Sequence, residues 1–432
     1  MYKKKILIAL ALTLPSIDSA IAIDKGNYDR QTSQYLPQGS HLGSFTLLPS
    51  FEFQNAYNSN IFYRDKITAS GKAQSTPSSY VAHFKPGVAI NSNWNRHALG
   101  FKLDTDLAQY VTLPDQNNYN DVHTSMNGLL DVVRDSSFTG NIGYNYLHES
   151  RGSPDQVNGI GPTFYNTVSF DGLYKHKINR VTVLPTFNFI NYAYQDVKTA
   201  TGSTLLMSTR SHQEFMPSLR VSYEIQPSYE AFLKIVYKEA KYDQLVYTNG
   251  SADPMNAYNR NSTGYNFLTG LAFDVSDLVT ADVSIGYLTR NYVDAKLKPI
   301  SGMNGFIDLK WQITKLTTLD GKVSRDINET TQAGVSGLLA TGISLGVDHE
   351  LRRNIHLMLG GSYTKNDYNG VAPGSTQGVR SDSLYSGNVG VKYLLNRYLS
   401  TDLSYSMQNR TTNYIGNGYD QSLVMLNVRT QY

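Results

Sequence analysis

The sequence predicts an all-β protein: a transmembrane, antiparallel, up-and-down β-barrel of about 18 strands, with 16 strands as the alternative. Three observations indicate this class. Apolar residues recur at every second position in segment after segment. Short and long polar connections alternate between these segments. The chain opens with a short apolar stretch typical of exported proteins, and no later apolar run approaches the roughly 18 residues of a membrane-spanning helix.

The first 22 residues have the composition of a secretory signal peptide. Three lysines precede a short apolar run, and Ala-Ile-Ala at residues 20–22 fits a small-residue cleavage site. We therefore expect cleavage after Ala22, a periplasmic N-terminal segment over residues 23–42, and the barrel over residues 43–432. The sequence contains no Cys, so neither a disulfide nor a lipid-anchored cysteine is available to hold the fold.

The alternation is clear in the segment over residues 279–287. Five apolar positions point one way and four small or polar positions point the other way: Val279, Ala281, Val283, Ile285 and Tyr287 against Thr280, Asp282, Ser284 and Gly286. Segments of this kind begin near residues 45, 79, 97, 121, 137, 163, 180, 211, 229, 262, 279, 303, 317, 338, 354, 382, 398 and 421. The mean hydropathy of −0.35 is compatible with a membrane location, because strands with one apolar face average out as polar.

The connections indicate where the barrel lies. Short connections fall at residues 94–96, 134–136, 226–228, 276–278, 352–354 and 395–397, and longer polar ones near 58–77, 149–161, 195–209, 242–261 and 367–380. A soluble sandwich would rarely keep so many strands with one continuous apolar face, whereas lipid requires a closed sheet without edges. We therefore expect a location in the outer membrane of a Gram-negative bacterium, with the short turns in the periplasm and lipid as the immediate surroundings.

The final strand ends on an aromatic residue of its apolar face. Val424, Leu426, Val428 and Tyr432 fall on alternate positions of the last twelve residues. We expect a closing strand whose outward face is the assembly signal, because its form resembles the signal that barrel-assembly machinery recognises. The alternative is an ordinary last strand.

Aromatic residues near the predicted strand ends fit the bands that anchor a barrel at the two membrane interfaces. Interface anchoring is the interpretation we favour over sugar stacking. The set expected at the outer rim is Tyr57, Phe62, Tyr63, Tyr80, Tyr110, Tyr194, Tyr287, Tyr292, Tyr363 and Tyr368.

No motif indicates catalysis. The nine His residues lack metal-ligand spacing, and the neighbours His148, Glu149 and Ser150 do not form a triad by adjacency alone. No G-x-S-x-G, Walker or EF-hand pattern is present. We therefore expect no enzymatic activity and no cofactor or metal. The net charge of +3 does not indicate a nucleic-acid partner.

Seven carboxylates are predicted to line the periplasmic mouth from inside: Asp131, Glu224, Asp274, Asp282, Asp320, Asp348 and Asp402. If unpaired, such a ring would repel anions or hold cations. The alternative is that nearby cations pair with it, namely Arg134, Lys315, Arg352, Arg353 and Arg397. The inward mid-strand positions carry more acidic than basic residues, which predicts a modest preference for cations.

Two stretches resemble a known family. The first hairpin, HLGSFTLLPSFEFQNAYNSNIFYRD at residues 41–65, and LLNRYLSTD at residues 394–402 are similar to the β-barrel porin family of outer-membrane proteins associated with exopolysaccharide and capsule gene clusters. The resemblance extends over nearly the whole mature chain, although its motifs are short. It implies an outer-membrane pore that exports a polysaccharide, with a periplasmic export protein as a partner, and it implies no catalytic residue.

Two other functions stay open. An 18-strand barrel has room for an aqueous channel, and the protein is alternatively a general diffusion porin for small solutes. Such a porin is expected to carry a charged constriction loop, often on the third outward connection, which here is the short, mixed-charge segment 149–161. The outer connections look too short for a large plug, although one could fold inward. The third alternative is a surface adhesin or scaffold with a filled barrel.

Overall fold

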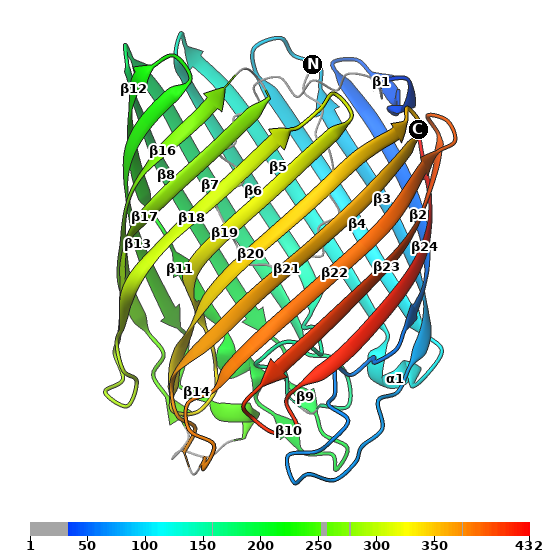
Figure 1. Ribbon diagram of the computed structural model, residues 1–432, viewed down its shortest axis with the longest axis vertical. Helices are drawn as coiled ribbons and strands as arrows, with labels where there is room; N and C mark the ends of the chain where they lie inside the picture. The colour runs from blue at the N-terminus through cyan, green and yellow to red at the C-terminus, as the bar shows by residue number, and fades with distance from the viewer. Residues whose placement is uncertain (1–32, 158, 252–256, 276–277, 374) are drawn as a thin grey trace.

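A closed barrel of 18 antiparallel strands forms the molecule (Figure 1). The computed structural model describes residues 33–157, 159–251, 257–275, 278–373 and 375–432, so the predicted signal peptide lies outside the described residues. Within these ranges no helix is long and apolar enough to cross a membrane.

Each predicted strand is present, and each begins within three residues of the expected position. The strands are β2 (Phe45–Asn58), β3 (Ser79–Ser92), β4 (Ala98–Tyr110), β5 (Tyr119–Val133), β6 (Ser136–His148), β7 (Phe164–Ile178), β8 (Val181–Tyr194), β11 (His212–Phe215) with β12 (Ser218–Gln226), β13 (Tyr229–Tyr242), β16 (Ser262–Val275), β17 (Val279–Tyr292), β18 (Ile300–Gln312), β19 (Thr317–Glu329), β20 (Val335–Arg352), β21 (Ile355–Gly370), β22 (Ser381–Leu394), β23 (Leu399–Thr412) and β24 (Tyr419–Gln431). β11 and β12 form one barrel strand that is interrupted at Met216 and Pro217, since proline has no N–H for the ladder.

Closure joins the two ends of the sequence. β24 pairs with β23 on one side and with β2 on the other, from Ser50–Gln431 to Asn58–Leu423. In Figure 1 the C-terminus and β1 (Ser40–Leu42), which folds back on β2, lie at one end of the barrel. We call this the short-turn end. The opposite, long-loop end carries the longer connections and their small elements: α1 (Pro114–Asn117), β9 (Val197–Lys198), β10 (Thr204–Leu205), η3 (Met207–Arg210), β14 (Val246–Tyr247), η4 (Thr248–Gly250) and β15 (Ala257–Tyr258).

The two faces of the wall follow the sequence alternation. On β17, Val283, Ile285 and Tyr287 are exposed on the outside, whereas Ser284 and Arg290 are buried on the inside. The large exposed apolar residues of the other strands continue this outer belt, which is the surface a barrel presents to lipid. The inner wall is therefore where polar side chains can act.

Candidate functional site: a loop across the barrel mouth

The connection between β6 and β7, residues 149–163, crosses the long-loop end of the barrel. Asp155 Oδ1 accepts hydrogen bonds from Thr330 Oγ1 at 2.6 Å and from the Thr331 N–H at 3.1 Å, and Gln332 Nε2 donates to the Pro154 carbonyl at 3.1 Å. β6 and β7 are the fifth and sixth barrel strands, whereas the connection at residues 330–334 joins the thirteenth and fourteenth. Segment 149–163, which we call the crossing loop, therefore reaches the opposite wall.

A buried ion pair anchors the start of the crossing loop. Arg210, from η3 of the neighbouring connection, donates from both terminal nitrogens to Glu149, with each N–O distance 2.9 Å. The Ser153 hydroxyl donates to the same carboxylate at 2.9 Å. The Arg210 guanidinium also lies over the Tyr194 ring at 4.4 Å. A two-pronged arginine–carboxylate pair fixes direction as well as distance, so this contact holds the loop in its inward course.

The ion pair makes the anchor sensitive to acid. Burial by itself would raise the pKa of Glu149, but the charge and hydrogen bonds of Arg210, with Ser153 and Arg151, bring the pKa below its ordinary value of 4.5. Glu149 holds the pKa of Arg210 well above its ordinary range in spite of burial. A carboxylate whose pKa is lower in the folded loop than in the unfolded chain stabilises the folded loop at pH values above the pKa that the carboxylate has in the unfolded chain. This stabilisation is lost as the pH falls through the pKa that the carboxylate has in the folded loop.

We expect the crossing loop to loosen below about pH 4.5, the ordinary pKa of Glu149, and to be held at neutral pH. Single-channel conductance recorded from pH 7 down to pH 3 should rise at the acid end. Glu149→Gln should raise the conductance already at neutral pH, since Arg210 then loses its counter-charge. Glu239→Gln, on the outward face of β13, is the matched control and should behave as the wild type. A flat pH profile in the wild type would contradict this role.

The rest of the crossing loop is held through backbone carbonyls. Arg151 donates to the Gln116 carbonyl at 2.7 Å and to Ile160 within the loop at 3.0 Å, and Arg410 of β23 donates to the Gly152 carbonyl at 3.2 Å. Gly152 packs against the Tyr63 ring so closely that a Cβ would lie 2.8 Å from Tyr63 Cδ1. Only glycine fits at this position without a shift of the ring.

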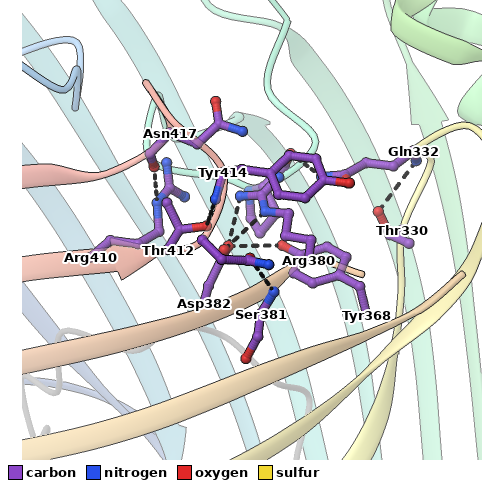
Figure 2. Close-up of polar contacts among 12 residues, drawn as sticks. Thr330, Gln332, Tyr368, Arg380, Ser381, Asp382, Arg410, Thr412, Tyr414 and Asn417 are labelled. Atoms are coloured by element: carbon purple, nitrogen blue, oxygen red, sulfur yellow. Dashed lines mark hydrogen bonds and ion pairs between the residues drawn. The ribbon is translucent and has the colours of Figure 1, made fainter. Parts of the chain in front are cut away.

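Beside the loop, a second buried ion pair lines the wall (Figure 2). Arg380 donates from Nε to Asp382 Oδ1 at 2.9 Å and from Nη2 to Oδ2 at 2.6 Å, and the Tyr368 hydroxyl donates to the same carboxylate at 3.1 Å. The Arg380 guanidinium lies over the Tyr368 ring, and Arg410 lies over Tyr419, both at 4.7 Å. Asp382 raises the pKa of Arg380, although burial opposes this. Paired charges and cation–π contacts thus hold the inner wall of the barrel at its long-loop end, which we call the inner rim.

Arginines recur at the long-loop end of the described barrel. Six arginines and four carboxylates take part in the contacts of the crossing loop and of the wall beside it: Arg151, Arg210, Arg260, Arg290, Arg380 and Arg410 with Glu149, Asp155, Glu329 and Asp382. The count of mid-strand charges in the sequence did not include these arginines. A sequence signal exists, because all six lie within three residues of the long-loop end of a barrel strand.

The seven predicted carboxylates lie on strands spread around the barrel, and several have partners on the inner wall. Ion pairs join Asp282 to Arg220 at 2.6 Å, Glu224 to Lys177 at 2.7 Å and Asp131 to Arg96 at 3.2 Å, and His356 Nδ1 lies within hydrogen-bond distance of Asp348 Oδ1 at 3.2 Å. Asp402 accepts from Asn427 at 3.1 Å, Asp320 is opposite Lys310, and Asp274 is opposite Thr280. The structure thus places them in a spread ring, and cation binding there stays a prediction. Over the described residues, no three His, Cys, Asp or Glu side chains group as metal ligands would.

The predicted rim aromatics divide between the two faces of the wall. Tyr57, Tyr80 and Tyr287 are exposed outward, as interface anchors would be. Phe62 and Tyr368 are buried, and Tyr194 lies under Arg210 at the inner rim. The sequence pattern grouped them by their expected nearness to the strand ends. It could not separate lipid anchors from rim residues, because at the strand ends both faces carry aromatic side chains.

The residues of the predicted assembly signal lie where the sequence indicated. Val424, Leu426 and Tyr432 are exposed on the outside of β24, with Val428 on the same face. The Tyr432 ring stacks on Tyr398 with centroids 5.9 Å apart. Recognition by assembly machinery stays a prediction.

A closed wall with an apolar belt outside, polar groups inside and a loop across one mouth defines an outer-membrane barrel of the porin type. A family model described as "Putative beta-barrel porin 2" matches residues 33–432, and the chain belongs to this family. The resemblance seen in the first hairpin is thereby confirmed, and so is the outer-membrane location of the barrel.

Solved structures similar to the chain are also barrels. The outer-membrane protein OpdK of Pseudomonas aeruginosa is 11% identical over 89% of this chain and 99% of that chain, with a TM-score of 0.44. OpdO of Pseudomonas aeruginosa is 10% identical over 89% of this chain and 97% of that chain, with a TM-score of 0.43. The siderophore receptor PiuA of Acinetobacter baumannii is 11% identical over 91% of this chain and 82% of that chain, with a TM-score of 0.44. No curated protein matches the chain.

Proposed function

We propose that the protein is an outer-membrane diffusion channel for small polar solutes, in which the crossing loop sets the size of the passage. The contact between Asp155 and Thr330 carries this proposal, because it ties the loop to the wall opposite its origin. An 18-strand barrel has an interior wide enough for water. A loop tied across its mouth divides that interior and limits the size of what passes.

The chemistry of the described rim favours polar solutes. Charged and hydrogen-bonding groups line it, with Glu149, Arg210, Arg380 and Asp382 as the two-pronged pairs. Fixed charges of both signs in a narrow aqueous passage favour solutes that exchange hydrogen bonds with them over apolar ones.

Export of a polysaccharide is the second candidate, and one observation favours it. Aromatic rings with arginines over them lie at the inner rim, with Tyr194, Tyr368 and Tyr419 as the examples. Aromatic and guanidinium surfaces suit the passage of an acidic sugar chain. A polymer would require the crossing loop to leave the mouth, so the Asp155 contact would then be the part that opens.

Asp155→Ala tests the proposed channel directly. The substitution removes two hydrogen bonds to a charged group, each contributing about 1.5–3 kcal/mol, so the loop should release from the opposite wall. We expect a higher single-channel conductance and, in liposome-swelling assays with sugars of increasing size, a larger size limit. Asp115→Ala, an exposed aspartate of the neighbouring connection, is the control and should leave both unchanged.

Two results would overturn the diffusion channel. One is a purified barrel that admits no small sugar and conducts no ions even as Asp155→Ala. The other is an unchanged size limit in that variant, which would show that the loop does not set the passage. A deletion strain that loses surface polysaccharide while its uptake of small solutes stays normal would favour the second candidate.

A further inference from the structure

The wall between β18 and β19 lacks its ladder at the long-loop end. Their pairing runs from Gln312–Thr318 only as far as Gly305–Arg325, whereas β17 stays paired with β18 up to Ile300. β20 likewise stays paired with β19 up to Glu329. In the described strands, residues 300–304 therefore face residues 326–329 without a backbone ladder, over roughly 16 Å at 3.3 Å per residue. We call this stretch the β18–β19 gap.

Side chains bridge the gap in place of the backbone. On the outer face Arg325 donates from Nε to the Met303 carbonyl of β18 and from Nη1 to Thr341 Oγ1 of β20, each at 3.1 Å. Across the gap, Arg290 Nη2 of β17 lies 2.6 Å from Glu329 Oε1 of β19. Contacts of this kind can open without unzipping a strand pair.

Asp326 helps to explain why the ladder stops. Its Oδ1 accepts the N–H of the next residue, Ile327, at 2.7 Å. A side chain that satisfies a nearby backbone N–H competes with strand pairing. The gap is thus built by the local sequence.

The gap lies at the height of the lipid head groups. Met303 is opposite Tyr287, which is opposite Phe267, and both aromatic residues are exposed on the outside. Thr341 is two residues from Ile343, which is opposite Tyr363. Aromatic bands mark the membrane interface, so the gap opens at this band and continues beyond it.

Behind the gap, buried polar atoms have unused hydrogen-bonding capacity. Arg290 Nε, Glu329 Oε2, Asn304 Oδ1 and Ser336 Oγ are buried without a hydrogen-bond partner among the described residues. Arg290 itself is only 3% exposed. Leaving such an atom unsatisfied costs about 1–3 kcal/mol. A polar group that entered the gap from the side would supply both donors and acceptors to them.

Cations lie near the gap. Lys296 and Lys298 are exposed on the connection that leads into β18, and Lys296 Nζ is 5.4 Å from the centre of the Tyr258 ring. Lys365 is opposite Thr341, and so lies in the same row as Arg325, with its Nζ 3.3 Å from Asp367 Oδ1. This arrangement suits phosphate or carboxylate groups.

We propose that the β18–β19 gap is a lateral binding site for the head group of an outer-leaflet amphiphile that carries anionic groups and hydroxyls. Arg325 and Lys365 bind its anionic groups. Arg290, Asn304, Glu329 and Ser336 receive its hydroxyls, and its hydrocarbon chains stay in the membrane beside Met303 and Ile327. Arg290 and Glu329 belong also to the inner rim, but the site opens toward the membrane and not toward the proposed passage.

Lipid retention tests the site on the purified full-length barrel in detergent, with lipopolysaccharide as the anionic, hydroxyl-rich probe and phosphatidylglycerol as the comparison. Native mass spectrometry should show lipopolysaccharide bound. Arg325→Ala with Lys365→Ala should weaken its binding by about a hundredfold, because each of the two lost charge-assisted contacts corresponds to about tenfold. Lys241→Ala, on the outward face of β13, should change nothing. Equal retention by the double variant and the wild type, or tighter binding of phosphatidylglycerol, would overturn the proposal.

A pair of engineered cysteines tests the gap itself, because the sequence has no Cys of its own. Ile307 and Val323 are directly opposite in the ladder, and Met303 and Ile327 would be opposite if the ladder continued. Ile307→Cys with Val323→Cys should form a disulfide. Met303→Cys with Ile327→Cys should resist direct oxidation and be bridged only by a longer bismaleimide. Equally rapid oxidation of both pairs would show a continuous wall and overturn the site.

Discussion

A chain that ends at residue 418 is expected to be absent from the outer membrane. The truncation removes β24 and with it the pairing to both β23 and β2. Two strand edges would then face lipid, where each unsatisfied backbone group costs several kcal/mol. We expect the truncated protein to be degraded in the periplasm, as measured by fractionation and by surface labelling of an exposed loop.

The control for this truncation keeps the strand and changes only its end. Tyr432→Ala removes the stack with Tyr398 but leaves the β24 ladder complete. We expect reduced but detectable assembly, because the outward face of Val424 and Leu426 remains. Normal surface levels of the truncated chain would show that the barrel closes without β24.

A charge on the lipid face should destabilise the barrel far more than a charge on the lumen face. Leu359 is 61% exposed on the outside of β21, opposite Val347 and Val389, and lies between the level of Tyr393 and that of Tyr363. Leu359→Arg should lower the free energy of unfolding by about 2–4 kcal/mol, the range measured for arginine at the bilayer midplane.

The neighbouring position supplies the matched control. Met358 points into the barrel opposite Asp348, so Met358→Arg places its charge beside a carboxylate and should have a mild effect. Urea unfolding in lipid vesicles compares the two variants. Equal losses would contradict the assigned faces, because a slip of one residue exchanges the two sides of a strand.

The barrel was predictable from the sequence because its signals are local. Alternation within each strand and the turn residues between strands predicted where each of the eighteen strands begins. The apolar face predicted for residues 279–287 is the exposed face of β17. Strand pairing in an up-and-down barrel follows chain order, so the topology required only the strand count.

The crossing loop was not predictable in the same way. Its position depends on Asp155 meeting Thr330 and on Glu149 meeting Arg210, contacts between residues far apart in the sequence. The sequence indicated only that the third outward connection is the usual place for a constriction. The rim arginines were missed because the charges were counted in mid-strand, where the wall is regular, and not at the strand ends.

The pairing of β2 with β24 has a consequence for the kinetics of folding. The first barrel strand to be synthesised can complete its pairing only after the last one has been made. Contacts between residues so distant in sequence form late, because the entropy of loop closure opposes them. During that interval the edge of β2 and the apolar faces of the other strands are open to aggregation. Closure of the barrel therefore waits until β24 is available, and a chain delayed before that step should be more prone to aggregation.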